Sequence, residues 1–160
     1  MTSFNILEET LKNISFNSFI DNDILAEIFG MNIIELNFES IKNMHVDNFI
    51  LVNKHLDSKI MRETILHEIA HKLRHIGHYK NVFEYKKMEA QANRFLLLLA
   101  LPEFFLLDDL INGIDIYELS NKYNVNIDIV EKRLELMYYD ELQNRKYNIN
   151  RNFKWHRAFL

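Results

Sequence analysis

One short stretch of the chain combines residue types and spacing that could do chemistry: His67-Glu68-Ile69-Ala70-His71. Four residues are slightly more than one helical turn, so on a helix the two imidazoles project from one face, about 40° apart, and can bind the same metal ion. Glu68 is turned by about 100° and can reach a water molecule beside that metal. The pattern predicts a zinc hydrolase site with His67 and His71 as ligands of Zn²⁺ and Glu68 as the catalytic base.

A catalytic zinc site needs a third protein ligand and one open position for water. The chain has no cysteine, so this ligand must be a histidine or a carboxylate. The pattern with a glycine three residues and a histidine six residues after His71 does not fit, because Arg74 and Gly77 occupy those positions. A carboxylate on the following helix is the other option, and Glu84 and Glu89 are both candidates.

Two helices must position these residues. The first is expected from Ser58 to Ile76, because Asp57 and Ser58 can both cap its start and Gly77 suits its end. Its apolar residues lie opposite the two histidines and would anchor it in a core: Met61, Ile65, Ile69, Leu73 and Ile76. The second helix is expected over 81–99, ended by Pro102, and it can fold back antiparallel to bring a carboxylate beside the histidines.

The remaining chain predicts an α+β fold, a mostly helical single domain with a small β-sheet packed beside the HExxH helix. The first thirty residues carry apolar positions at helical spacing and predict two short helices that end at Gly30. β-branched and aromatic runs predict strands at 33–38 and 49–52, the only convincing β region. Further helices are expected over 102–110 and over 114–139, the latter interrupted at 124–126.

An ordered set of motifs surrounds the HExxH helix. Val52-Asn53 ends a predicted strand before that helix, and Glu89-Ala90-Gln91-Ala92-Asn93, with Phe95 two positions on, follows it. A leucine-rich run from Leu96 then closes at Pro102. In this order of motifs the sequence resembles the ImmA/IrrE family of metallopeptidases, over about residues 30–136.

The resemblance implies a gluzincin-like site in which Glu89, rather than Glu84, completes the zinc ligands with His67 and His71, and Glu68 is the general base. Asn93, one turn after Glu89, is a candidate for hydrogen bonding around the metal, although an exposed helical asparagine explains it equally well. A donor for the developing oxyanion is also needed, and the alternatives that remain open are three: Tyr79, His78 and Tyr85.

The resemblance also implies a function. Members of this family accompany helix-turn-helix repressors of the Xre/Cro-CI type in phages and other mobile elements, and cleavage of the repressor relieves repression. We therefore expect a zinc-dependent endopeptidase with a helix-turn-helix repressor as its protein substrate. The alternative from another class is a non-proteolytic regulator that binds a repressor or DNA, with the HExxH site structural or inactive.

Composition and charge limit the other possibilities. The 160 residues suit one domain, expected over 1–140, and a net charge of −4 does not favour nucleic acid as a partner. Residues 141–160 form a basic, aromatic tail with Arg145, Lys146, Arg151, Lys154 and Arg157 against a single acid. The longest apolar stretch is too short for a membrane span and the N-terminus lacks a signal pattern, so a cytoplasmic protein is expected.

The segment 116–136 has the spacing of a helix-turn-helix, with Asn126 able to cap its second helix. The would-be recognition helix carries a net negative charge over 128–141, whereas phosphate contacts demand positive charge. We therefore interpret this segment as a packing element, and nucleic acid as an unlikely partner.

Overall fold

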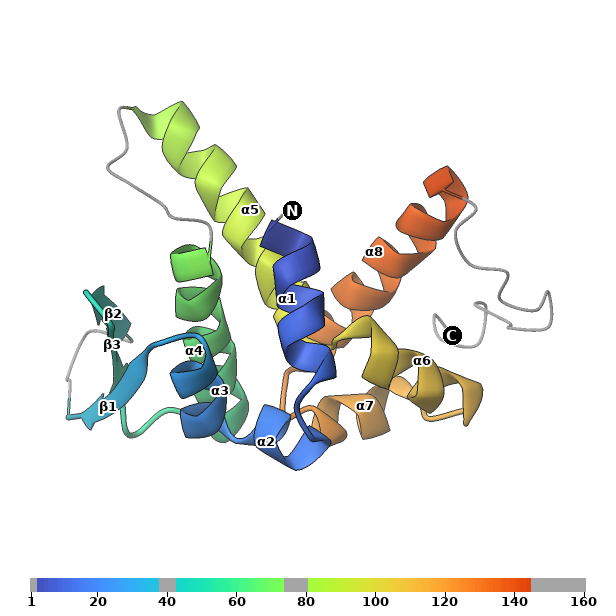
Figure 1. Cartoon of the computed structure of the whole chain (residues 1–160), viewed down its shortest axis with the longest axis horizontal. Helices are drawn as coiled ribbons and strands as arrows, with labels where there is room; N and C mark the ends of the chain where they lie inside the picture. Colours follow the sequence, from blue (N-terminus) through green and yellow to red (C-terminus); the bar gives the residue numbers. More distant parts are fainter. Residues whose placement is uncertain (1–2, 38–42, 74–80, 145–160) are drawn as a thin grey trace.

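The computed structural model describes residues 3–37, 43–73 and 81–144, which form eight helices and three strands (Figure 1). The predicted α+β class, mostly helical with a small sheet, is confirmed. In chain order the elements are α1 (Ser3–Lys12), α2 (Phe16–Ile20), α3 (Asn22–Ile28), β1 (Asn32–Leu36), β2 (Asn43–Val46), β3 (Phe49–Asn53), α4 (Ser58–Leu73), α5 (Val82–Ala100), α6 (Glu103–Ile111), α7 (Ile116–Lys122) and α8 (Ile127–Asn144).

The sheet has the strand order β1-β3-β2, with β1 parallel and β2 antiparallel to the central β3. The two predicted strand regions correspond to β1 and β3, and Phe38 lies outside the described residues. Strand β2 has no counterpart among the predicted strands, because this short strand is defined by its pairing with β3 across a turn in which Asp47 has a φ of 54°. Ile50 and Val52 of β3 are buried and point into the core.

The N-terminal region contains three helices, where the sequence predicted two. The extra break has a local cause, because Ser15 and Asp21 each cap a new helix by accepting a backbone N–H three residues on. The predicted stop at Gly30 is confirmed, since α3 ends at Ile28 and Gly30 has a φ of 68°, a conformation that favours glycine.

Helix α4 lies between the sheet and α5 (Figure 1). The predicted apolar face is buried at Ile65 and Ile69, with Met61 and Leu73 partly buried beside it. Ile76 and Gly77, at the predicted end of this helix, lie outside the described residues. Helix α4 is therefore anchored by one face, as the pattern predicted.

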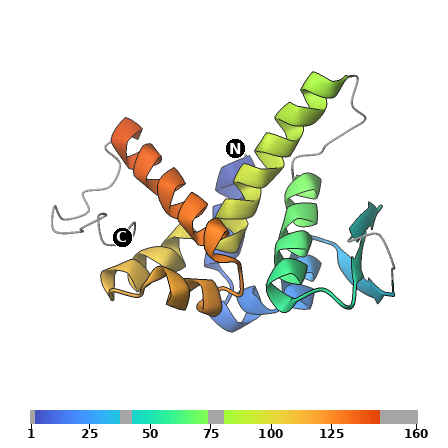
Figure 2. The same cartoon turned by 180° about the vertical axis from the view of Figure 1, so that it is seen from behind.

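The later helices follow the predicted boundaries closely. Asn81 caps α5 through its side chain, and Pro102 immediately precedes α6. The predicted interruption over 124–126 separates α7 from α8, and α8 continues to Asn144. Figure 2 shows α5 and α8 diverging from a common region, with α6 and α7 on the α8 side and the sheet on the α4 side. The tail beyond Asn144 lies outside the described residues.

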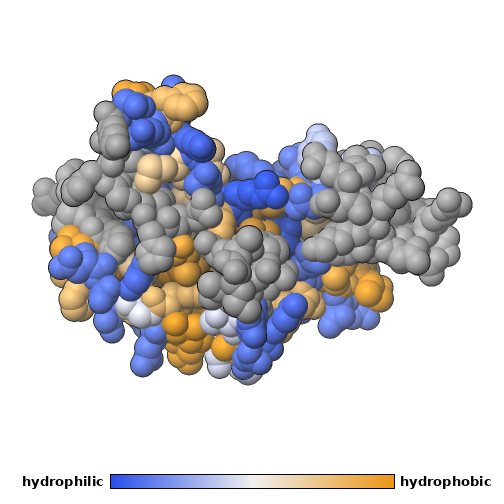
Figure 3. Space-filling model, turned by 45° about the horizontal axis from the view of Figure 1, so that its top comes forward, coloured by the Kyte–Doolittle hydropathy of each residue, from blue (hydrophilic) through white to orange (hydrophobic). Residues whose placement is uncertain are grey.

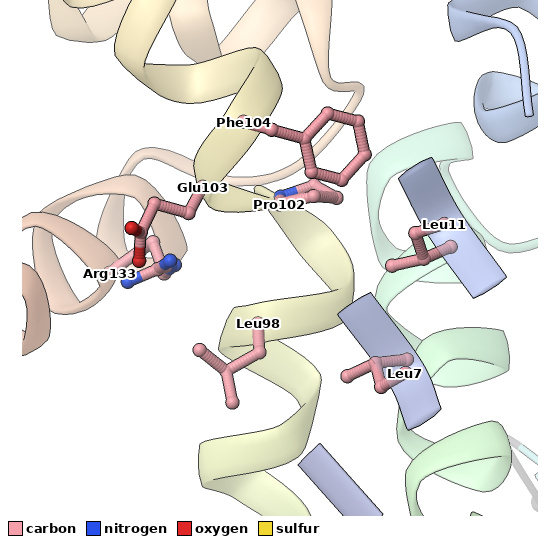
Figure 4. Close-up of a pocket in the computed structure, with 7 residues that line it drawn as sticks. All are labelled: Leu7, Leu11, Leu98, Pro102, Glu103, Phe104 and Arg133. Carbon is pink, nitrogen blue, oxygen red and sulfur yellow. The ribbon is translucent and has the colours of Figure 1, made fainter. Parts of the chain in front are cut away.

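A small pocket lies where α1 crosses α5 and the start of α6 (Figure 4). Leu7 and Leu11 of α1 line it from one side and Arg133 of α8 from another, and the Arg133 Nε donates to the Leu101 carbonyl at 3.0 Å. Most of the residues that line this pocket belong to the hydrophobic core or pack against it, and none of them belongs to the HExxH motif. None of the described helices is long and apolar enough to cross a membrane.

Candidate metal centre

The two histidines of the HExxH motif face one another on α4. Their Nε2 atoms are 2.8 Å apart and their ring centroids 4.4 Å apart, in an edge-on arrangement. This closeness follows from the helix, because residues four apart in sequence are neighbours on one face. Both side chains are partly exposed, 25% for His67 and 15% for His71, so a small ligand can reach their nitrogens from solvent.

Glu89 reaches this pair from α5. Its Oε2 lies 3.5 Å from the His67 Nε2, and its Oε1 lies 3.3 Å from the His71 Nε2. One ligand atom from each of the three residues lies within 4.8 Å of the others, which makes them a group that could hold a metal ion. We call this group the metal cluster: His67, His71 and Glu89.

The chemistry of the donors fits zinc. Ligands at 2.0–2.1 Å in a tetrahedron around zinc lie about 3.3 Å from one another, which matches the two distances between Glu89 and the histidines. The 2.8 Å between the imidazole nitrogens is shorter, a distance at which one ring nitrogen can donate a hydrogen bond to the other. Two imidazoles and one carboxylate are also a ligand set found in catalytic zinc sites that keep an open position.

Glu68 lies on α4, directly after His67 in the sequence, and is buried, with 9% of its surface exposed. It does not belong to the metal cluster, and its position beside His67 follows from the helical turn of about 100° per residue. Glu68 is thus a buried carboxylate that follows His67 directly in the chain and lies outside the group of candidate ligands.

The structure separates the other sequence candidates. Glu84 stands near the start of α5 and is not part of the metal cluster, although its backbone N–H is bound by the Asn81 cap. Asn93 is exposed and, within the described part of the chain, its side chain makes no hydrogen bond to the cluster. Tyr85 is on α5 one turn before Glu89, whereas His78 and Tyr79 lie outside the described residues.

Long side chains that no sequence motif marked form hydrogen bonds from α4 to neighbouring elements. Lys72, next to His71, donates from Nζ to the Gly30 carbonyl at 2.6 Å and to the Asn48 side chain at 2.8 Å. Lys72 therefore joins α4, the helix that carries both histidines, to the end of α3 and to the turn between β2 and β3. No local pattern marks such a residue, because its partners are 24 and 42 positions away in the sequence.

The segment with helix-turn-helix spacing is also fastened to α4. Lys59 donates from Nζ to the Ser120 hydroxyl at 2.7 Å and to the Asn121 side chain at 3.0 Å. Glu63 accepts the backbone N–H of Asn126 at the start of α8. The negative charge of this segment predicts a packing element, and these contacts show that it packs against α4.

The chain matches the family model of the IrrE N-terminal-like domain, peptidase M78, over residues 26–135. The matched region is more than half of the chain and contains the sheet, both helices of the metal cluster and the first half of α8. No curated protein matches the chain. The resemblance inferred from motifs over about 30–136 is thus confirmed, and the chain belongs to the ImmA/IrrE family of metallopeptidases.

Proposed function

We propose that this protein is a zinc-dependent endopeptidase, with His67, His71 and Glu89 as the metal ligands and Glu68 as the general base. One observation carries the proposal: two imidazole nitrogens and a carboxylate from two different helices converge within 4.8 Å, and the residue that follows His67 on α4 is a buried glutamate. The family match supports peptide hydrolysis as the reaction.

The chain's own residues have distinct tasks in this reaction. Zinc bound in the cluster would supply Lewis acidity, which polarises a carbonyl and makes water a better nucleophile near neutral pH. Glu68 takes a proton from the attacking water and passes it to the leaving amine as the peptide bond breaks. The partly exposed faces of His67 and Glu89 leave the cluster open to an incoming polypeptide.

We further propose that the substrate is a helix-turn-helix repressor of the Xre/Cro-CI type, carried by a phage or mobile element, and that its cleavage relieves repression. This part rests on the family resemblance of the sequence motifs. The rival is a non-proteolytic regulator that binds a repressor or DNA. The two differ in whether the carboxylate of Glu68 is needed.

The test compares the wild type with Glu68→Gln, which keeps the size of the side chain and leaves the metal cluster intact. Each is expressed in host cells, and newly formed protein N-termini are mapped by mass spectrometry. New N-termini in a repressor, lowered at least about 100-fold in Glu68→Gln, are the expected result. Equal cleavage and equal relief of repression by both proteins would contradict the peptidase. Cleavage confined to other proteins would contradict only the repressor as substrate.

A further inference from the structure

The N-terminal part of α5 extends past the described end of α4. Figures 1 and 2 both show this end of α5 projecting beyond Leu73, the last described residue of α4. Glu89 lies near the middle of α5, so the helix continues for about two turns beyond the metal cluster. The projecting part is Val82 to Met88.

An apolar face runs along α5 through the metal cluster and out onto the projecting part. On the C-terminal side of Glu89 this face is buried, at Ala92, Leu96 and Leu99. With about 100° per residue, Tyr85 and Val82 lie within about 40° of Glu89 on the same face. Both are exposed, Tyr85 at 45% and Val82 at 71%, whereas the buried residues of this face have 6% or less. Apart from the exposed Asn93 at its edge, this face is thus core on the C-terminal side of Glu89 and exposed at Tyr85 and Val82 on the N-terminal side.

The exposed part of this face lies within a few residues' reach of a polypeptide bound at the metal cluster. Along a helix, Tyr85 is about 6 Å and Val82 about 10 Å from Glu89. An extended peptide advances about 3.3 Å per residue, so these distances correspond to two or three residues from the bond being cut. A polypeptide with a carbonyl at the metal cluster therefore places side chains beside Tyr85 and Val82 if it runs along α5.

We propose that Val82 and Tyr85 form a subsite that binds an apolar side chain of the polypeptide substrate, two or three residues from the scissile bond. This inference rests on the proposed function, because the metal cluster defines where that bond lies. A branched aliphatic group and an aromatic ring offer no charge and bury apolar surface when an apolar side chain covers them. Figure 3 shows hydrophobic side chains on this projecting arm among hydrophilic ones.

The chain offers a matched control for this subsite. Phe83 is 77% exposed at the same end of α5, but it lies about 160° around the helix from Tyr85. Removing Phe83 therefore changes the exposed apolar area of this arm without touching the proposed subsite. Tyr85→Phe is a second control, because it keeps the ring and removes only the hydroxyl that could serve the oxyanion.

The experiment uses the zinc-supplied full chain and a library of internally quenched decapeptides with randomised positions. Cleaved bonds are identified by mass spectrometry for the wild type and for Val82→Ser, Tyr85→Ser, Tyr85→Phe and Phe83→Ser. Peptide retention on the Glu68→Gln protein, with and without the Val82 and Tyr85 substitutions, is measured with the same library. Retention needs no catalysis, so it reports on the subsite even if the chain cleaves nothing.

We expect the wild type to prefer an apolar residue two or three positions from the cut. Val82→Ser and Tyr85→Ser should each lower this preference by about threefold to tenfold in kcat/KM, with metal content unchanged. Phe83→Ser and Tyr85→Phe should keep the preference, even if loss of the Tyr85 hydroxyl slows all peptides equally.

The outcomes distinguish the two proposals. Cleavage without an apolar preference, or a preference equally weakened by Phe83→Ser, overturns the subsite and leaves the peptidase intact. No cleavage, with apolar peptides still retained through Val82 and Tyr85, overturns peptide hydrolysis and supports the subsite. Absence of any apolar enrichment on Glu68→Gln overturns the subsite as well.

Discussion

The Nε2 of His71 and the Oε1 of Glu89 lie 3.3 Å apart, although the two residues belong to different helices. This contact turns a pair of histidines, which any helix with the right spacing would present, into a three-residue cluster. It depends on the packing of α5 against α4, the most extensive helix pair of the fold.

The zinc content of the protein should depend on the side chain of Glu89 and not on that of Glu84. We expect about one zinc per wild-type chain, because three ligands with an open position bind zinc tightly. Glu89→Ala removes one ligand and should weaken zinc binding at least about tenfold, whereas Glu84→Ala, at the start of the same helix, should keep it. Elemental mass spectrometry on tag-free protein measures both. Little metal in well-folded, zinc-supplied wild type would contradict the metal centre.

Arg62 should be one of the most sensitive positions for stability. Its buried guanidinium donates to the Phe19 and Ile20 carbonyls at 3.1 and 3.0 Å and stacks over the Phe19 ring, so it ties α4 to the N-terminal helices. Burial lowers the pKa of Arg62 to about 10, partly offset by Asp21, and the group is charged at neutral pH.

Arg62→Met leaves buried carbonyls without donors and should lower the free energy of unfolding by about 2–4 kcal/mol. Urea unfolding measures this change. Arg94→Met is the control, because Arg94 is 58% exposed and pairs with Asp140 at the surface, where such a loss is worth less than about 1 kcal/mol. An equal loss of unfolding free energy in Arg62→Met and Arg94→Met would show that Arg62 does not stabilise the packing of α4 against the N-terminal helices.

The free energy of unfolding should decrease above about pH 10 because of the buried hydroxyl of Tyr123. Its buried hydroxyl donates to Asp109 at 2.8 Å, and burial, followed by the Asp109 contact, raises the pKa of Tyr123 above its ordinary value near 10. Above pH 10 the unfolded chain releases this proton while the folded chain keeps it, so the free energy of unfolding decreases by up to about 1.4 kcal/mol per pH unit.

Urea unfolding at pH 8 and pH 11 checks this effect. Tyr123→Phe should be less stable at pH 8 by about 1 kcal/mol, because one buried hydrogen bond is lost, but its stability should fall less between the two pH values. The difference between the two proteins isolates Tyr123 from other groups that titrate in this range. An equal decrease in unfolding free energy between pH 8 and pH 11 in the wild type and in Tyr123→Phe would mean that the folded chain does not keep the Tyr123 hydroxyl protonated.

Glu63 should stabilise the junction between α4 and α8. Its carboxylate accepts the Asn126 backbone N–H immediately before α8, which satisfies a donor at a helix start from a different helix. Glu63→Ala should cost about 1 kcal/mol of unfolding free energy, the usual value of a lost cap, and Glu63→Gln, which keeps an acceptor oxygen, should cost less. Chemical unfolding curves compare them, and an unchanged midpoint in Glu63→Ala would disprove this role.

Much of the fold was predictable because its signals are local. The face of α4 that packs into the core, the start of α5 near Asn81 and the break between α7 and α8 each depend on residues within one or two turns of one another. The split between α2 and α3 was missed even though its cause is local, because Asp21 caps a helix inside a run of continuous apolar spacing.

The sequence by itself determined the placement of His67, Glu68 and His71, because a helical repeat of 3.6 residues brings positions four apart onto one face. It also identified the family, through the order of its motifs. The residues themselves left Glu84 and Glu89 open and the resemblance implied Glu89, but only the tertiary structure shows Glu89 beside the histidines, since this depends on how far α5 has turned where it crosses α4. The tertiary structure also revealed strand β2 and the hydrogen bonds that link α4 to other elements through Arg62, Glu63 and Lys72. Each of these contacts joins residues that are distant in sequence, and no local periodicity encodes such a contact.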